Sequence, residues 1–305
     1  MVTLSRQEQA LGAAAGVLAD RVLGEPPAAV HPVVAFGSAM GAVERALWRD
    51  TRGAGLAYAA TGMGLGVGAG AALGSTAIAT TVAVGGRALA MAAGEVARAL
   101  VAGDTEVARA LLPGLVGRDP YGLDDKEMAR AVVESVAENT VDAVVAPALW
   151  AAVAGAPGAL GYRAANTLDA IVGNRSDRYR RFGWASARVD DLIGYVPARL
   201  TAALVVAVRP RSAAAVWRAV ADDAPRHPSP NAGVAEAAFA AALGLCLGGA
   251  SSYGGVGELR PSLGQGRPPE AADIGRAIAL STDVSLALAG GLAAMGLWCQ
   301  RVGRR

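Results

Sequence analysis

The chain has 305 residues, with 28 basic and 26 acidic side chains and a formal net charge of +2. It is 53% hydrophobic and only 18% charged, with two cysteines and two histidines. The balanced charge argues against a nucleic-acid-binding protein, and the composition excludes a disordered chain or a disulfide-rich scaffold. Because a water-soluble protein carries about 25% charged residues, this deficit indicates a membrane protein.

Apolar stretches predict the membrane-embedded helices. The fold class we expect is all-α, a polytopic helical membrane protein with about five or six such stretches, since about 20 apolar residues cross a bilayer. Amphipathic interfacial helices accompany them. In chain order the stretches are residues 9–23 (interrupted by Asp20 and Arg21), 53–86, 143–162, 192–208 (interrupted by Arg199), 237–257 and 284–300.

The N-terminal stretch passes directly into a polar segment. Asp20 and Arg21 are followed by Gly24, Glu25 and two prolines, and His31 begins the next segment. Charges followed by Gly and Pro predict a helix end and a rigid turn. No small-residue cleavage site separates the two parts, so we interpret the stretch as retained rather than as a signal peptide. Simple interfacial positions for Asp20 and Arg21 remain an alternative.

Glycines recur within residues 53–86, at positions 62, 64, 66, 68, 70 and 74. They form overlapping small-xxx-small spacings, which let helix backbones approach closely in lipid. No G-x-G-x-x-G dinucleotide fingerprint can be completed there. We therefore interpret these glycines as packing residues.

Residues 87–142 predict an amphipathic helical insertion between the apolar stretches. Asp124 and Glu127 predict an N-cap with a capping box. Further along this segment, Glu134, Glu138 and Asp142 follow one another at four-residue spacing and repel one another, which favours a bound cation. Hard oxygen ligands suit Mg²⁺ better than Zn²⁺. A solvated acidic face is the alternative. One helix face carries Glu127, Arg130, Glu134, Glu138 and Asp142, in which Arg130 can pair with Glu134.

Residues 143–162 predict a re-entrant helical hairpin. The stretch contains Gly155, Pro157 and Gly158, and two similar motifs flank it, Asn139-Thr140-Val141-Asp142 and Asn166-Thr167-Leu168-Asp169. A turn at Gly155 to Gly158 brings both motifs to the same side of the membrane. A coincidental match is the alternative.

Basic residues are distributed too evenly among the loops to predict the orientation.

Residues 162–191 are rich in arginine, interleaved with Tyr179, Phe182 and Trp184. Guanidinium groups bind phosphate or carboxylate in a bidentate manner, so the segment suits an anionic, flat, conjugated ligand. Anionic lipid headgroups are the alternative. Asp190 and Asp191 stand at the mouth of the next stretch, where burial is costly, and are functional candidates for that reason.

Residues 222–233 form another polar segment, in which Ser229 or Asn231 is expected to cap the following helix and leave an anion site at its N-terminus. Lys126 is the only lysine and precedes Glu127, so no phosphate-binding loop of the G-x-x-x-x-G-K type exists. The cysteines and histidines show no zinc spacing.

Together these polar segments resemble the CobD/CbiB family of cobalamin biosynthesis, integral-membrane adenosylcobinamide-phosphate synthases, over almost the whole chain. Departures are Val234-Ala235, where the family commonly has Trp-Pro, and Asn174, where an aromatic residue is common. The matching segments are Asp20-Arg21 with Gly24 and Pro26, His31-Pro32-Val33-Val34 with Gly37, Glu134-Ser135-Val136-Ala137-Glu138-Asn139-Thr140-Val141-Asp142, Tyr162-Arg163-Ala164, Asn166-Thr167-Leu168-Asp169, Phe182-Gly183-Trp184-Ala185-Ser186-Ala187-Arg188 with Asp190-Asp191, Pro197-Ala198-Arg199-Leu200-Thr201, Ser229-Pro230-Asn231-Ala232-Gly233 and Tyr253-Gly254-Gly255.

The resemblance implies one membrane-embedded domain, residues 1–305, in the cell (inner or plasma) membrane. It implies an acid–amine ligase that joins (R)-1-aminopropan-2-ol, or its O-phosphate, by an amide bond to the free propionate of adenosylcobyric acid. ATP and Mg²⁺ are the implied cofactors, with an acyl-phosphate or acyl-adenylate intermediate, and the corrinoid is substrate rather than cofactor.

The implied partners are the two substrates and membrane lipid, with no nucleic acid. A homo-oligomer, or association with other late-pathway corrinoid membrane enzymes, is left open. The alternative function is a membrane transporter or channel for a small anionic or corrinoid solute, since broken helices and intramembrane charges also mark transport pathways.

The resemblance also implies roles for particular residues. A general base must deprotonate the amine, because an ammonium is not nucleophilic; Asp20, Glu25 and His31 are its candidates. The metal ligands are Glu134, Glu138, Asp142 and Asp169, and the catalytic set is Asp20, Glu25, His31, Glu138, Asp142 and Asp169. The substrate-binding set is Arg21, Asn139, Tyr162, Arg163, Asn166, Arg175, Arg178, Tyr179, Arg180, Trp184, Ser186, Arg188, Asp190, Asp191, Arg199, His227, Ser229, Asn231 and Tyr253, with Arg163, Arg175, Arg178, Arg180 and Arg188 for phosphates.

Overall fold

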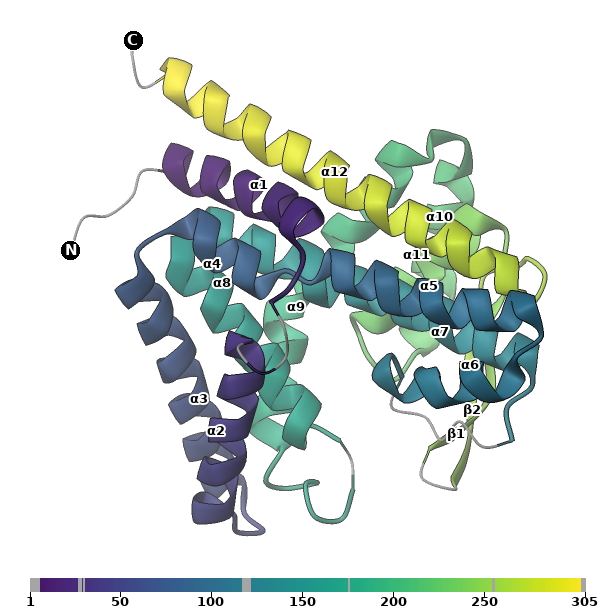
Figure 1. The fold of residues 1–305 in the computed structure, drawn as a ribbon, viewed down its shortest axis with the longest axis horizontal. Helices are drawn as coiled ribbons and strands as arrows, with labels where there is room; N and C mark the ends of the chain where they lie inside the picture. The colour runs from purple at the N-terminus through teal and green to yellow at the C-terminus, as the bar shows by residue number, and fades with distance from the viewer. Residues whose placement is uncertain are drawn as a thin grey trace. The chain divides into compact units, whose positions relative to one another are not determined.

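The computed structural model describes residues 6–26, 29, 31–116, 122–174, 176–253 and 256–302, without the side chains of residues 250–259 and 302. Helices dominate the fold, and two strands form an antiparallel hairpin (Figure 1). The helices are α1 (Arg6–Leu23), α2 (Pro32–Leu47), α3 (Arg52–Leu73), α4 (Thr76–Ala83), α5 (Gly86–Ala102), α6 (Thr105–Leu111), α7 (Asp125–Thr140), α8 (Ala146–Val172), α9 (Trp184–Val208), α10 (Ala213–Asp222), α11 (Ala232–Leu243) and α12 (Ala271–Val302). The short turns are η2 (Leu112–Gly114), the π-turn η3 (Val141–Val145), η4 (Pro210–Ser212) and η5 (Ala224–Arg226), and the strands are β1 (Leu247–Tyr253) and β2 (Val256–Leu263).

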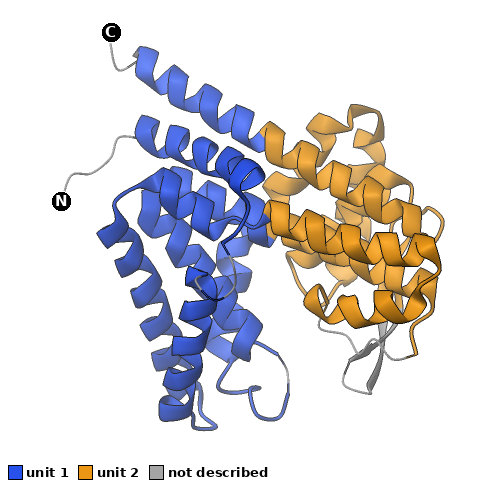
Figure 2. Ribbon diagram, viewed as in Figure 1, with its two compact units in different colours: residues 1–85, 142–195, 288–305 blue, residues 86–141, 196–287 orange. Residues whose placement is uncertain are grey.

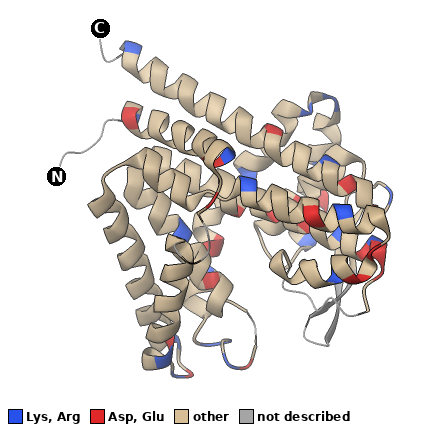
Figure 3. Cartoon of the chain, viewed as in Figure 1, with Lys and Arg blue, Asp and Glu red and all other residues tan. Residues whose placement is uncertain are grey.

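Five helical segments of the described chain are long and apolar enough to cross a membrane, which confirms the polytopic all-α prediction. Figure 3 shows α3 and much of α12 almost free of charged residues. The helix α1, which covers the predicted N-terminal stretch, is not among the five. They are Arg52–Leu73, Thr76–Ala102, Asp125–Val172, Trp184–Val208 and Ala271–Arg301.

Two of the predicted apolar stretches are divided by glycine. Residues 53–86 form α3 and α4, because Gly74 ends α3 with a left-handed φ of 66°. Residues 237–257 were expected to form a membrane-embedded helix, and this expectation is wrong. The helix α11 ends at Leu243, Gly244 takes a φ of 69°, and the chain continues into β1. Only glycine adopts such φ values at low cost, so the apolar composition does not extend the helix.

The chain folds into two compact units (Figure 2). Unit 1 comprises residues 1–85, 142–195 and 288–305, and unit 2 comprises residues 86–141 and 196–287. The first segment of unit 2 is almost the predicted amphipathic insertion. Neither unit is a continuous piece of chain. The single domain stays a prediction.

In unit 1, the packing of α3 against α8 depends on glycine. A Cβ at Gly62, Gly66 or Gly70 would overlap Leu168, Ala164 or the backbone of Ala156, whereas a Cβ at Gly64 or Gly68 would meet nothing within 4 Å. Residues four apart share a helix face. The small-xxx-small prediction is therefore confirmed for the face that contacts α8, and the other glycines face away from it.

The helix α8 reverses the chain direction. Backbone angles break the helix at Ala154 and Gly155, where Gly155 has a φ of 66°. Twenty residues of straight helix would span about 30 Å, yet the hydroxyl of Tyr162 donates to Oδ1 of Asp142 at 3.2 Å. A Cβ at Gly158 would overlap the carbonyl oxygen of Trp150, so the two arms are tightly packed. The predicted turn is thus present, and it returns the second arm of α8 to the start of the first.

In unit 2, local chemistry sets the start of α7. Asp124 accepts from the backbone N–H of Glu127 at 2.8 Å, and Glu127 accepts from that of Asp124 at 2.9 Å. The predicted capping box is confirmed. The helix buries most of its residues and packs against α5 and α11.

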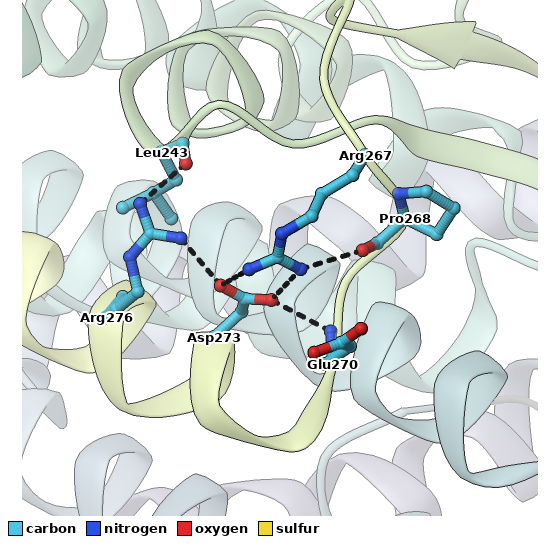
Figure 4. Close-up of polar contacts among 6 residues, drawn as sticks. All are labelled: Leu243, Arg267, Pro268, Glu270, Asp273 and Arg276. Carbon is cyan, nitrogen blue, oxygen red and sulfur yellow. Dashed lines mark hydrogen bonds and ion pairs between the residues drawn. The ribbon is translucent and has the colours of Figure 1, made fainter.

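A buried carboxylate holds the base of the hairpin β1–β2 in unit 2 (Figure 4). Asp273, fully buried, accepts two hydrogen bonds from Arg267 at 2.7 and 3.0 Å and one from Arg276 at 2.6 Å. Arg276 also donates to the carbonyl oxygen of Leu243 at 2.6 Å. The hydrogen bonds to Asp273 raise the pKa of Arg267 above its usual value. The segments before and after the hairpin are thereby tied to the first turn of α12.

Candidate functional site

The α8 hairpin gathers polar side chains in unit 1. Tyr162 reaches Asp142, and one turn further along α8 the amide of Asn166 donates to Oδ1 of Asp190 at 3.4 Å. Arg163 follows Tyr162 in the chain. We define the unit 1 polar cluster as these five residues together with Glu25 and His31, whose contacts are described next.

Glu25 and His31 connect to the same region through Gly85. The Nε2 atom of His31 lies 3.4 Å from Oε2 of Glu25. The other carboxylate oxygen of Glu25 lies against Gly85, where a Cβ would overlap it, and the N–H of Gly85 donates to the carbonyl oxygen of Ala143 at 2.9 Å. Ala143 directly follows Asp142. Residues far apart in the sequence therefore meet at the point where the α8 hairpin closes.

Two cavities flank the second arm of α8. One, of about 110 Å³, begins beside His31 at Pro32 and Val33, and Arg163 is the charged residue among the described residues that line it. The other, of about 280 Å³, is lined by Tyr162 and by apolar residues that include Trp150. Ligand sites are concave and mostly apolar, with a few polar groups that orient the ligand. This arrangement suits an apolar group with an acidic group beside it.

The arginine-rich segment is only partly available for a ligand. Arg178 donates to Oε1 of Glu44 at 2.9 Å, and the hydroxyl of Tyr179 donates to the same oxygen at 3.0 Å. The Arg178 guanidinium also stacks over Trp48 at 4.7 Å. Its hydrogen bond to Glu44 raises the pKa of Arg178 above its usual value. Both predicted binding residues thus anchor this segment to α2 in the structure.

The other predicted residues of this segment have varied surroundings. Arg188 forms an exposed ion pair with Asp191 at 3.6 Å, and Arg180 is exposed. Trp184 carries the guanidinium of Arg52 over its ring at 5.1 Å. The hydroxyl of Ser186 is buried and has no hydrogen-bond partner among the described residues. Arg175 lies outside the described residues.

In unit 2, another predicted group surrounds the start of α11. Arg199 donates to the carbonyl oxygen of Pro230 at 3.0 Å and to Oδ1 of Asn231 at 3.1 Å. Ser229 accepts from the backbone N–H of Asn231 at 3.3 Å and of Ala232 at 3.2 Å. Asn231 occupies the N-cap position of α11 but makes no side-chain cap hydrogen bond, because its side chain accepts from Arg199. Ser229 lies two residues before the N-cap, so the capping prediction is not confirmed for either side chain, although Ser229 does bind these two backbone N–H groups. Because Ser229 occupies these N–H groups, they do not form an open anion site.

His227 is buried beside an acidic residue. Its Nε2 atom lies 3.7 Å from Oε1 of Glu236, and the exposed fractions of the two side chains are 3% and 1%. The Nδ1 atom accepts from the backbone N–H of Ser229 at 3.1 Å. This geometry favours a role in holding the turn before α11. The side chain of Tyr253, predicted to bind substrate, lies outside the described residues.

The predicted metal ligands differ in environment. Glu134 is buried, accepts from the N–H of Gly248 at 2.8 Å and pairs with Arg130 at 3.9 Å, which confirms that predicted ion pair. Glu138 is exposed, and Asp142 lies in the π-turn η3, which interrupts the regular face of α7. Within the described ranges, no group of three His, Cys, Asp or Glu side chains is placed to hold a metal ion.

The remaining predicted residues lie in unit 1, with one exception. Asp20 is 1% exposed within α1, and Arg21 next to it is half-buried. Asp169 is near the end of α8, with its carboxylate against Gly173. The exception is Asn139, which belongs to unit 2 and donates to the carbonyl oxygen of Ser135 in its own helix at 2.9 Å.

The sequence did not single out Glu44 or Gly85. Glu44 is the first charged residue after a long apolar run in α2, which is a signal for a buried carboxylate with a specific partner. Gly85 carries no such signal, because its importance comes from Glu25 lying against it. Unit 2 also has an unpredicted cavity of about 420 Å³, lined by Arg218, Asp222, Asp223 and Arg226 among others, and none of the predicted site residues lines it.

The fold and the site define a polytopic helical membrane protein with carboxylate and arginine side chains gathered beside apolar cavities. The family model described as CobD/Cbib protein matches residues 13–281. The chain belongs to the CobD/CbiB family.

Relatives named Cobalamin biosynthesis protein CobD match most of the chain. The protein from Mycobacterium tuberculosis (strain ATCC 25618 / H37Rv) is 48% identical over 291 residues, which cover 90% of this chain and 92% of the relative. The one from Chromobacterium violaceum is 45% identical over 281 residues, covering 87% and 89%, and the one from Geobacter metallireducens is 41% identical over 282 residues, covering 83% and 86%. No solved structure matches the chain.

Proposed function

We propose that this protein acts in cobalamin biosynthesis, in the cell membrane, as an amide-forming ligase. It joins (R)-1-aminopropan-2-ol, or its O-phosphate, to the free propionate of adenosylcobyric acid, and the product is adenosylcobinamide or its phosphate. Membership of the CobD/CbiB family supports the pathway. The observation that carries the reaction type is the unit 1 polar cluster, in which carboxylates and an arginine meet beside apolar cavities.

The cluster offers the groups that amide formation needs. Adenosylcobyric acid presents a free carboxylate on a conjugated ring, and Arg163 beside an apolar cavity offers a partner for that carboxylate next to apolar surface. The Arg163 guanidinium binds the carboxylate or the phosphate that activates it, because such pairs are charge-assisted and bidentate. Asp20, Glu25 and His31 are the candidates to accept a proton from the amine, and the His31 ring lies beside the Glu25 carboxylate.

ATP supplies the group that converts the carboxylate into a good electrophile. Mg²⁺ bound to a nucleotide takes one or two carboxylates and completes its shell with phosphate oxygens and water. A preformed group of three acidic residues is therefore not needed. Glu138 is the better ligand candidate in unit 2, because it is exposed whereas Glu134 is buried with Gly248. Asp142 is a separate candidate in unit 1.

Replacing Glu138 tests the metal role. Glu138→Gln is expected to lower ligase activity at least about 10-fold and to raise the Mg²⁺ concentration needed for half-maximal rate, since loss of even a residue that supports a metal ligand costs about 10- to 100-fold. Because Glu138 is exposed, the variant should keep the wild-type melting temperature in detergent. An unchanged Mg²⁺ dependence contradicts the role.

The reaction itself is tested with purified protein in detergent. Cobyric acid, aminopropanol or its phosphate, and ATP with Mg²⁺ are expected to yield the amide, detected by mass spectrometry. Omission of ATP is expected to abolish product. Failure to form the amide with either amine, under conditions in which the protein stays folded, contradicts the proposal.

Transport of a small anionic or corrinoid solute is the alternative, and the break in α8 at Gly155 is the observation that favours it. A transporter forms no amide in detergent. In sealed vesicles it moves labelled corrinoid across the bilayer, which an enzyme working on one face does not do.

A further inference from the structure

We propose that Glu25 accepts the amine proton, that His31 is a positioning residue for Glu25, and that Gly85 provides the space for the Glu25 carboxylate. This inference rests on the proposed function. It chooses among the three residues that the sequence left open, Asp20, Glu25 and His31, and it adds Gly85.

His31 is not placed to accept a proton. Its Nδ1 atom accepts from the backbone N–H of Val33 at 3.2 Å and so caps α2. A neutral imidazole with one accepting nitrogen carries its proton on the other. The Nε2–H of His31 therefore faces Glu25, at 3.4 Å from Oε2. Protonation of Nδ1 would remove the cap, so both nitrogens of His31 are committed.

Exposure separates the two carboxylates. Asp20 is 1% exposed inside α1, whereas the Glu25 side chain is 29% exposed. Glu25 is therefore the more accessible of the two carboxylates to an amine from solution. The side chain of His31, at 8% exposed, forms the buried side of the pair. Glu25 thus combines access with a fixed orientation.

Gly85 fixes where the second oxygen of Glu25 lies. It is buried between α4 and α5, and a Cβ there would overlap Oε1 of Glu25. The next nearest side chain, Ala143, would be at ordinary contact distance, 4.0 Å. Gly85 also donates its N–H to Ala143, which follows Asp142. The Glu25 carboxylate is therefore held beside the chain that leads to Asp142 and Tyr162.

In amide formation, two protons leave the nitrogen, one C–N bond forms and one C–O bond breaks. The Glu25 carboxylate takes one proton from the ammonium, and the nitrogen lone pair then forms the C–N bond at the activated carbonyl carbon. The bond from that carbon to the phosphate or adenylate oxygen breaks, and the leaving group takes its electron pair. The second proton of the nitrogen passes to the leaving group, and Glu25 releases its proton to water.

Two nucleophiles test the role of Glu25. Hydroxylamine is unprotonated at neutral pH and needs no base, so it reports activation of the carboxylate alone. With the full chain in detergent, Glu25→Gln should lower amide formation from aminopropanol by about 100-fold or more. Hydroxamate formation, with cobyric acid, ATP and Mg²⁺, should stay within about threefold of wild type.

His31→Asn tests the positioning role. Asparagine can still cap the helix but has no Nε2–H. We expect a lower kcat for amide formation, an unchanged KM for cobyric acid and normal hydroxamate formation. Wild-type rates in this variant contradict the positioning role.

If Glu25→Gln keeps amide formation, or loses both products equally, Glu25 is not the base. If wild-type protein forms neither product, the proposed function itself fails.

A double-mutant cycle tests Gly85. In Gly85→Ala, the new methyl group meets only the end of a flexible side chain, so the variant should fold and displace the Glu25 carboxylate. We expect amide formation to fall at least about 10-fold, with no further fall when Gly85→Ala is added to Glu25→Ala. Gly64→Ala, which meets nothing within 4 Å, is the control. Equal effects in both backgrounds contradict the role of Gly85.

Discussion

Buried carboxylates tie separate segments of the chain together at the residue scale. Glu44 anchors the arginine-rich segment through Arg178 and Tyr179, and Glu134 accepts the N–H of Gly248 at the hairpin. A buried carboxylate is costly unless its oxygens are hydrogen-bonded. These contacts therefore explain why charged residues remain in a chain that otherwise has few of them.

Asp273 is the clearest example of such a buried carboxylate, and replacing it should destabilise unit 2. Asp273→Asn loses the charge that holds Arg267 and Arg276, and both arginines are about half exposed, at 50% and 48%. We expect a loss of about 2 to 3 kcal/mol, below the full cost of breaking a buried pair because the arginines can reach water. Thermal unfolding in detergent measures it.

The matched control is on the same helix. Asp283 pairs with Arg209 at 2.7 Å, but this pair is exposed at 42% and 35%. Asp283→Asn should cost no more than about 1 kcal/mol. Equal losses for the two variants would show that burial does not set the strength of these pairs.

Small residues set the helix contacts at the element scale. Gly62, Gly66 and Gly70 of α3 face Leu168, Ala164 and Ala156 of α8. In lipid, helix association depends on close backbone packing because no water is released. The spacing along α3 predicted such a face, but the sequence did not indicate that the second arm of α8 is its partner.

Gly66→Ala tests this contact. The added methyl group would overlap Ala164 and the carbonyl oxygen of Leu160, so part of the backbone must move. We expect a loss of about 1 to 3 kcal/mol, as for other overpacked sites. Gly68→Ala should be neutral or slightly stabilising, because no atom lies within 4 Å and alanine is the better helix former. A melting temperature that ranks the variants in the opposite order contradicts the packing argument.

At the scale of the whole molecule, the main feature is the uneven distribution of charged residues along the chain. Five segments of the described chain can cross a membrane by length and composition, and one of them contains the reversal at Gly155. A reversal inside an apolar segment changes the number of crossings, and the basic-residue rule predicts an orientation only for a given set of crossings.

Cysteine labelling tests the reversal in the membrane. Cys246 and Cys299 are replaced by alanine, and Asp142→Cys and Asn166→Cys are made one at a time in that background. Because Tyr162 contacts Asp142, we expect an impermeant thiol reagent to label both positions from the same side of intact cells or inverted vesicles. Labelling from opposite sides would show that α8 crosses the bilayer without turning back.

The sequence by itself determined the class of fold, the capping box at Asp124 and the small-residue face of α3, because each depends on residues close together in the chain. It also identified the polar segments by their resemblance to a family. Only the tertiary structure decided that Glu25, His31 and Gly85 meet near Asp142, and that Arg178 and Tyr179 are held by Glu44. The physical reason is that these contacts join residues far apart in the sequence, and no local pattern encodes which distant carboxylate or glycine will be the partner.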